Sequence, residues 1–352
     1  SVPASSLGFV HENSIDAEEH EFGFTAMILR REGHTNEINK FTDAYRHAGG
    51  RQTQIGLSLS DTWNPAGGWN LFAALKGEWF HDDEGIRRGW KTSNGEFSIR
   101  EDFEVGGSFD ISKAFSETIA ARASLRSHVR QPTLNELYRP YRVGAFSVAA
   151  NENLKVERIT GIEIGLDWQV TERMSASLGL FHDQLNDSVA NVSEPSNPND
   201  ATRRNLEKAK VDGLELSVEH LLTEELSFRF QGLLMDSEVR SCPANPGLVG
   251  NRFAQVPKRR STASLLWSPS LWELRLDARH ESERFDDARN SRLLDNCFNL
   301  DLSLSKMFSK NTRIFLTVNN ISDEEIETLR NAENIIYVEA PRNWLVGLDW
   351  KF

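Results

Sequence analysis

The chain has 352 residues, with 52 acidic and 40 basic side chains and a formal net charge of −12. This charge disfavours a nucleic-acid partner, because neutralising phosphates requires a basic surface. The mean hydropathy is −0.48 and no window holds 18 consecutive apolar residues, which excludes a transmembrane helix but permits a membrane barrel. No linker-like change of composition divides the chain, so residues 1–352 are treated as one domain.

Apolar and polar residues alternate along most of the chain. Side chains two positions apart share one face of a strand, so each run predicts a strand with one apolar and one polar face. The clearest runs lie at residues 55–59, 71–79, 103–111, 119–125, 162–170, 214–218, 226–230, 272–278, 298–304 and 314–318. We predict an all-β, antiparallel fold of about 15 strands, an awkward number because single-chain bacterial barrels have an even count.

The connections between these runs alternate in length. The short ones lie near residues 66–68, 112–117, 171–173, 223–225, 269–270 and 309–311. The long ones span residues 32–50, 83–96, 130–157, 187–205, 239–257, 284–296 and 320–340. Short turns on one rim and long loops on the other are typical of an outer-membrane β-barrel whose long loops lie outside the cell.

The last strand carries the strongest apolar face. Trp344, Val346, Leu348, Trp350 and Phe352 share one parity, while the alternate positions are mostly small or polar. Nothing downstream could cover such a face, whereas lipid could. The run therefore predicts a membrane-facing strand.

Five short segments have the spacing of known sequence boxes: residues 130–138 (RQPTLNELY), 151–165, 205–215, 318–323 and 341–352. In this order they resemble the RxPxxNELY, NPxLKPERxxxxExG, N…GxE, vNNlxD and PRxxxxGlxxxF boxes of TonB-dependent outer-membrane receptors. Glu152 and Val156 stand where proline is usual in the family. The resemblance is best over residues 100–352 and elsewhere rests on strand pattern.

The resemblance implies a transmembrane barrel of about 22 strands round a plug, so this chain would hold roughly the last 15 strands without the plug. It implies a Gram-negative outer-membrane receptor that captures and imports a scarce nutrient, a ferric siderophore or cobalamin-like chelate. The implied partners are outer-membrane lipid, the barrel assembly machinery, and TonB with its inner-membrane complex, acting through the absent plug. Trp350 and Phe352 resemble the terminal signal that the assembly machinery reads.

Residues 130–158 form the longest predicted loop, which carries Tyr138, Arg139, Tyr141 and Arg142. Arginine and tyrosine together suit an anionic or catecholate ligand, through charge-assisted hydrogen bonds and stacking. The alternative is that polar residues fix the base of the loop and the aromatic residues cover a rim. The family's haem receptors have a histidine between the first two boxes, and none lies there in this chain, which disfavours haem.

Metal ligands are sparse. Asp82, Asp83 and Glu84 end a predicted strand and are weak candidates for calcium, because the spacing lacks the interleaved pattern of a dedicated loop. His34 and His47 share one predicted loop without a clear carboxylate partner, so a solvated loop is favoured there over a metal site. We therefore expect no cofactor other than a possible calcium ion.

Cys242 and Cys297 fall on neighbouring external loops, which the implied topology places in an oxidising compartment. We expect a disulfide, worth about 3 to 4 kcal/mol in the chain-entropy model, with two free thiols as the alternative. No nucleophile motif, zinc motif or phosphate loop supports an enzyme. Two other functions stay open: a passive porin of about 14 to 16 strands, and a soluble all-β binding or adhesion module.

Overall fold

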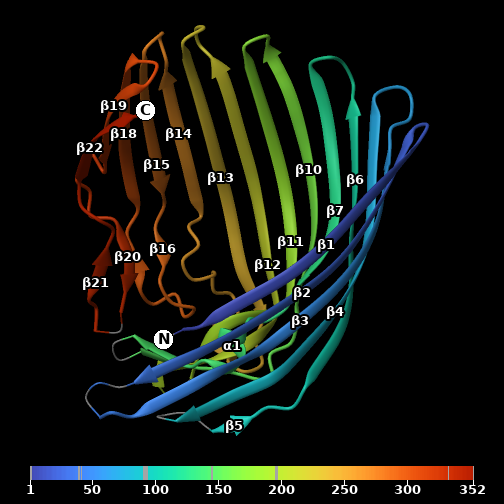
Figure 1. Ribbon diagram of the computed structural model, residues 1–352, viewed down its shortest axis with the longest axis vertical. Helices are drawn as coiled ribbons and strands as arrows, with labels where there is room; N and C mark the ends of the chain where they lie inside the picture. Colours follow the sequence, from blue (N-terminus) through green and yellow to red (C-terminus); the bar gives the residue numbers. More distant parts are fainter. Residues whose placement is uncertain are drawn as a thin grey trace.

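The structure is a computed structural model that describes residues 2–38, 40, 42–89, 94–143, 146–194, 197–331 and 333–351. It contains one tall, curved sheet, in which the strands within residues 4–89 slant across the more upright later strands (Figure 1). Eighteen strands form this sheet and three of them are short, which leaves fifteen long strands. The long strands are β1 (Ala4–Ala17), β2 (His20–Ile38), β3 (Tyr45–Trp63), β4 (Trp69–Gly89), β6 (Arg100–Ala114), β7 (Ile119–Arg130), β10 (Glu157–Thr171), β11 (Met174–Glu194), β12 (Asn197–Leu221), β13 (Leu226–Ser241), β14 (Arg259–Trp267), β15 (Trp272–Glu281), β18 (Cys297–Ser309), β19 (Thr312–Asn319) and β22 (Asn343–Trp350).

Each long strand pairs antiparallel with the next long strand along the chain. This confirms the all-β, antiparallel prediction and its strand count. Among the described residues β1 pairs only with β2 and β22 only with β19, so the sheet is open at both edges. Because the count is odd, β1 and β22 run in the same direction.

The two rims of the sheet differ as the sequence predicted. Tight turns join β1 to β2, β10 to β11 and β18 to β19 at one rim, the upper end of Figure 1, where the chain also ends. The long connections gather at the opposite rim, where α1 (Leu134–Tyr138) lies. They hold the remaining short elements: β5 (Gly95–Glu96), β8 (Tyr141–Val143), β9 (Phe146–Ala149), η1 (Pro246–Leu248), β16 (Arg284–Phe285), β17 (Leu293–Leu294), β20 (Glu327–Arg330) and β21 (Ile336–Val338).

β10 illustrates why the sheet has two unlike faces. Ile162, Ile164, Leu166 and Trp168 share one parity and are 43% to 53% exposed. Ile164 and Leu166 pair with leucines of β11, so the apolar row continues across strands on the same face. This exposed apolar face is the side that a lipid bilayer would cover.

The opposite, concave face carries ion pairs. Arg122 on β7 contacts Asp167 at 2.6 Å and Glu163 at 3.4 Å, both on β10. Arg126, four residues further along β7 and on the same face, contacts Glu163 at 3.4 Å and Asp183 of β11 at 3.3 Å. A polar inner wall behind an apolar outer face is the arrangement of a barrel with a hydrated lumen.

The fully buried side chains lie near the rim of long connections. One cluster comprises Val192, Leu206, Val239, Cys242 and Leu248. The second comprises Leu137, Tyr138 and Leu154 around α1. Long connections therefore pack on one another and on the strand ends, instead of lying free in solvent. Within the described residues, no helix is long and apolar enough to cross a membrane.

The predicted disulfide is wrong in this structure, where Cys242 and Cys297 are both free and buried. Cys242 follows β13 and Cys297 begins β18, and β14 and β15 lie between these strands. Three strand spacings amount to roughly 14 Å, which exceeds the Cα separation that a disulfide spans. The two cysteines were assigned to neighbouring loops from the sequence, but this does not bring their Cα atoms close enough for a disulfide.

Candidate ligand-binding site

The connection between β7 and β10 begins with α1, a helix of only five residues that is capped at both ends. Thr133 is the N-cap: its hydroxyl accepts a hydrogen bond from the Glu136 backbone N–H, and the Glu136 carboxylate accepts one from the Thr133 backbone N–H. This reciprocal pair is a capping box and satisfies two amide groups that the helix leaves unpaired. The helix therefore starts at a fixed position after Pro132.

Arg130 ties this helix to the sheet. Its guanidinium donates to Glu136 at 2.9 Å and to Glu157 of β10, also at 2.9 Å. Burial alone would raise the pKa of Glu136, but the hydrogen bonds from Arg130 and Thr133 together hold it below its ordinary value. The ionised carboxylate thus joins the base of the connection to its first helical turn.

Tyr138 is not accessible to a ligand, so its prediction as a ligand contact is wrong. The side chain is 1% exposed and packs with Leu137 and Leu154, and its ring stacks on Phe97 with a centroid distance of 5.2 Å. Burial raises the pKa of Tyr138 to about 12. Gly85 of β4 lies so close that an added Cβ would sit 2.7 Å from the tyrosine ring. Tyr138 is a core residue that docks α1 on β4.

The other three predicted residues lie at the end of α1 and just beyond. Arg139 contacts Glu37 of β2 at 2.8 Å, and its side chain stays one-third exposed. The Tyr141 hydroxyl accepts a hydrogen bond from Asn191 at 3.1 Å. Arg142 is exposed. Arg139 and Tyr141 are thus each held by a neighbouring strand, and the use of Arg139, Tyr141 and Arg142 as ligand contacts stays a prediction.

Arg203 of β12 was not predicted and organises the same region. Its guanidinium donates to the Asn135 and Arg139 carbonyl oxygens at the C-terminal end of α1 and lies 5.2 Å from the centre of the Tyr141 ring. The Asn135 carbonyl oxygen already accepts a hydrogen bond from the Arg139 backbone N–H, so Arg203 is its second donor and also pairs the Arg139 carbonyl group beyond the helix. The box around residue 205 was recognised as a strand entry, but no local signal connects Arg203 to α1.

A cavity of about 650 Å³ lies between the start of the sheet and α1. Its basic lining residues are Arg31, Arg130 and Arg139. Arg130 and Arg139 are paired with glutamates, whereas Arg31 is exposed and, among the described residues, has no carboxylate within ion-pair distance. Polar lining groups include Gln52, Gln131 and Asn135, and the acidic residue Glu32 also lines the cavity, 3.5 Å from the His34 ring. The cavity thus offers positive charge and hydrogen-bond donors.

Arg31 is a second residue that the sequence interpretation missed. It pairs with Ser6 of β1 and Gln52 of β3, and Gln52 lines the same cavity. Arg30 lies on the other face, in the outward row that continues from Ile28. The alternation along β2 places the two arginines on opposite faces. Near the start of the chain, however, the alternation of apolar and polar residues was too weak to show which face is the inner one.

The calcium prediction is not supported. Asp82 accepts a hydrogen bond from Gln131 at 2.6 Å, whereas Asp83 and Glu84 both contact the Arg51 guanidinium, at 2.5 and 2.7 Å. Glu84 has a positive φ and lies at the register shift between β3 and β4, so Asp83 and Glu84 both turn to Arg51 while Asp82 turns to Gln131, and the three carboxylates do not converge. Within the described part of the chain no group of three histidine, cysteine or acidic side chains could hold a metal. The His34 and His47 rings stack with centroids 5.3 Å apart.

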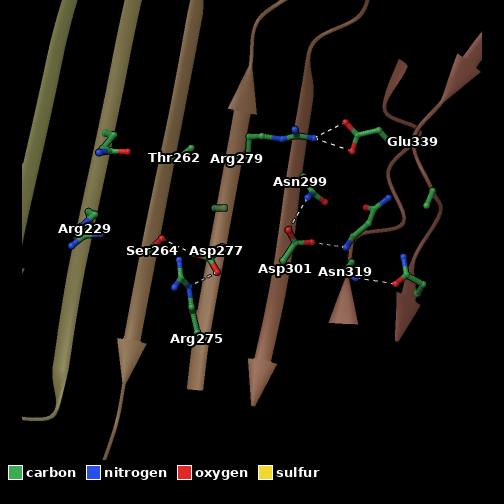
Figure 2. Close-up of a pocket in the computed structure, with 15 residues that line it drawn as sticks. Arg229, Thr262, Ser264, Arg275, Asp277, Arg279, Asn299, Asp301, Asn319 and Glu339 are labelled. Carbon is green, nitrogen blue, oxygen red and sulfur yellow. Dashed lines mark hydrogen bonds and ion pairs between the residues drawn. The ribbon is translucent and has the colours of Figure 1, made fainter. Parts of the chain in front are cut away.

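A second cavity, of about 630 Å³, lies against the inner wall of the last strands. Figure 2 shows Arg279 of β15 reaching across to Glu339, which belongs to the connection before β22. Both Glu339 oxygens lie about 3.0 Å from one Arg279 nitrogen. Asp277 accepts hydrogen bonds from Ser264 and Arg275 in the same view. This wall is mostly polar, with several amide side chains beside the ion pairs.

The predicted assembly signal falls on the last strand. Trp350 is 61% exposed and shares its parity with the exposed Trp344, Val346 and Leu348. Phe352 lies outside the described residues. An exposed apolar row at the sheet edge is compatible with recognition by another protein, and its use as a signal stays a prediction.

Comparisons with known proteins agree with this geometry. An iron-regulated outer membrane virulence protein of Vibrio cholerae is 23% identical over 290 residues, covering 73% of this chain and 43% of that protein. The vitamin B12 transporter BtuB of Photobacterium profundum is 24% identical over 270 residues, covering 70% and 40%. The solved structure of the copper transporter OprC superposes with a TM-score of 0.78 at 16% identity, covering all of this chain and 57% of that one.

The chain thus spans about half the length of the proteins that it matches. The family model described as TonB dependent receptor-like, beta-barrel, matches residues 5–321. That range includes the first fourteen long strands and both rims of the sheet. The chain therefore belongs to the TonB-dependent receptor β-barrel family, whose place is the bacterial outer membrane.

Proposed function

We propose that the protein containing this chain captures a scarce metal chelate outside the cell and imports it with energy from TonB. The observation that carries the proposal is the cavity under α1. It is lined by basic side chains and lies beside the polar inner wall of a chain that belongs to the TonB-dependent receptor β-barrel family. The work is binding and transport, and we assign no catalytic residue.

Arg31 and Arg139 are the proposed ligand contacts. Both line the cavity, and they reach it from β2 and from the end of α1. A ferric siderophore commonly carries negative charge, and guanidinium groups bind carboxylate or catecholate oxygens through two parallel hydrogen bonds. Arg139 would have to exchange Glu37 for the ligand, whereas Arg31 can bind without giving up a partner. Arg142, exposed in the same connection, is a further candidate contact.

The substrate class is a metal chelate, either a ferric siderophore or a cobalamin-like compound. The names of the relatives support this range, since one is iron-regulated and another is a vitamin B12 transporter. The barrel would be inserted by the assembly machinery, bounded by outer-membrane lipid, and coupled to TonB through a plug domain. An acidic chain of this kind has no proposed nucleic-acid partner.

The test is uptake by cells that express the full-length gene in a host without its own receptors. Labelled ferric siderophores and labelled cobalamin are supplied separately, with and without a functional TonB. We expect saturable accumulation of one class that stops when TonB is inactivated. Accumulation that does not saturate and is independent of TonB would instead identify a passive porin.

A further inference from the structure

The lipid-facing side carries a row of side chains that runs across β11, β12, β13 and β14. Leu180 pairs with Leu214, and Leu214 pairs with Leu234. Leu234 in turn pairs with Arg259 at the start of β14. Directly paired residues of an antiparallel ladder share a face, so Arg259 belongs to the same outward row as the three leucines.

The next outward row toward the long connections is charged. His182 pairs with Asp212 and Asp212 pairs with Asp236. The His182 ring lies 2.6 Å from Asp212, and Lys258 contacts Asp236 at 3.1 Å. Two residues along a strand correspond to roughly 6 to 7 Å. The apolar band therefore ends between these rows, and Arg259 lies at the boundary between hydrocarbon and headgroups.

A cavity of about 590 Å³ opens on this boundary. Leu180, Leu214 and Leu234 form its apolar side, and Lys258 and Arg259 lie at its charged side. Leu180 and Leu234 are 45% and 50% exposed, so acyl chains can contact them. Arg252, Asp212, Asp236, Ser282 and Glu283 complete the polar part of the lining. The cavity, which we call the notch, therefore has an apolar end toward the membrane core and a charged end toward the headgroups, which matches the acyl chains and headgroup of a lipid.

The lining of the notch holds three basic and three acidic side chains, so an anion would be bound by an individual unpaired arginine and not by an excess of positive charge. Asp212 is paired with His182 and Lys210, and Asp236 with Lys258. Arg259 is exposed, and no carboxylate of the described residues lies within ion-pair distance of it. Glu283 is the remaining acidic group of the lining, and among the described residues it forms no ion pair with Arg252 or Arg259. An arginine beside hydrocarbon is costly unless it reaches an anion, and phosphate suits its planar group.

We propose that this notch, bounded by Leu180, Leu214, Leu234 and Arg259, binds a phosphate-bearing lipid of the outer leaflet. The acyl chains lie over the leucines and the phosphate accepts hydrogen bonds from Arg259, with Lys258 beside it. The site is on the outer wall, separate from the cavity under α1, and does not depend on the transported substrate.

The test compares a diphosphorylated lipid A with its dephosphorylated analogue, added to the detergent-purified protein and counted by native mass spectrometry. The wild-type protein should bind the phosphorylated form roughly tenfold more tightly, the effect of one charge-assisted contact. Arg259→Gln should abolish this preference. Arg260→Gln is the matched control, because Arg260 faces the lumen side and contacts Glu281 at 3.3 Å, and it should leave the preference unchanged.

Two further variants keep the test decisive if Arg259→Gln fails to fold. Arg259→Lys should retain part of the preference, and Glu283→Gln should increase it, because that substitution removes the opposing charge. The proposal is overturned if the wild-type protein shows no preference, if Arg259→Gln keeps it, or if Glu283→Gln leaves it unchanged. Displacement of the lipid by an equal concentration of inorganic phosphate would also overturn it, since that result identifies an anion site without lipid specificity.

Discussion

The two arginines at positions 30 and 31 show how strand alternation separates neighbouring residues into different roles. Arg31 lines the cavity under α1, while Arg30 lies on the outward face. The residue types alone do not distinguish them. Their pairing partners do, because each residue takes the face of the residue opposite it.

Substitution of Arg31 tests the proposed ligand contact. Arg31→Ala in the full-length receptor should weaken chelate binding roughly tenfold, because one charge-assisted hydrogen-bonding group is lost. Arg30→Ala is the control and should bind as the wild type does. The measurement is the concentration of labelled chelate that gives half-maximal cell binding. Equal effects of the two substitutions would point to general surface charge and against a site.

Glu136 gives the connection after β7 a defined pH dependence. Its pKa is lowered from 4.5, so its stabilising contribution is complete above about pH 4.5 and is lost as the pH falls through the lower folded-state value. Wild type should therefore exceed Glu136→Gln in protease resistance of residues 131–156 at pH 7, and the difference should shrink below about pH 4.5. A difference that is constant down to pH 3 would contradict this assignment.

The two thiols provide a direct check on the absence of a disulfide. Both cysteines are free and buried, so neither should react quickly with a maleimide in the folded protein, and both should react after unfolding without a reductant. Mass spectrometry then counts two labels. A count of zero until a reductant is added would show that the bridge forms after all.

At the scale of elements, the strands were predictable and the short helix was not. Residues 130–158 were interpreted as a loop, although Thr133 and Glu136 have the spacing of a capping box, which could have located α1. A helix of five residues has no periodicity long enough to detect. Its position depends on Arg203 and Gly85, which are distant in sequence.

Gly85 tests how α1 docks on β4. Gly85→Ala would place a methyl group 2.7 Å from the Tyr138 ring, so the ring and the helix must shift, at a cost of about 1 to 3 kcal/mol. Limited proteolysis between residues 131 and 156 should become faster. Gly33→Ala is a suitable control, since the nearest atom to its added methyl group would lie at 3.6 Å, an ordinary contact. Equal proteolysis of both variants would show that Tyr138 adapts freely.

At the scale of the whole molecule, β1 and β22 are the edges of the sheet that remain unpaired among the described residues. An odd number of antiparallel strands makes these edges parallel, so they cannot join as neighbours in an antiparallel barrel without intervening strands. The edge strands also expose apolar side chains on both sides, as Leu7, Phe9 and Val10 do on β1. Exposed edges of this kind pair readily with other strands.

Hydrogen exchange in the isolated 352-residue chain should reveal these edges. In β1 and β22 the amides that point away from their single neighbour should exchange within the dead time, while those of β10 and β11 stay protected, because both edges of each inner strand are paired. Full protection of β1 would contradict an open edge and show that another strand, from a second copy or elsewhere, covers it.

The sequence by itself determined the architecture: antiparallel strands, one apolar face, unequal rims and the family boxes. These features repeat with a period of two and depend on neighbouring residues, so they can be read locally. Only the tertiary structure decided the site. Arg139 meets Glu37, 102 positions earlier, Tyr138 is buried against Gly85, and the two cysteines are separated by two strands. Such contacts arise where long connections fold over the rim, and no local pattern specifies which side chains will meet there.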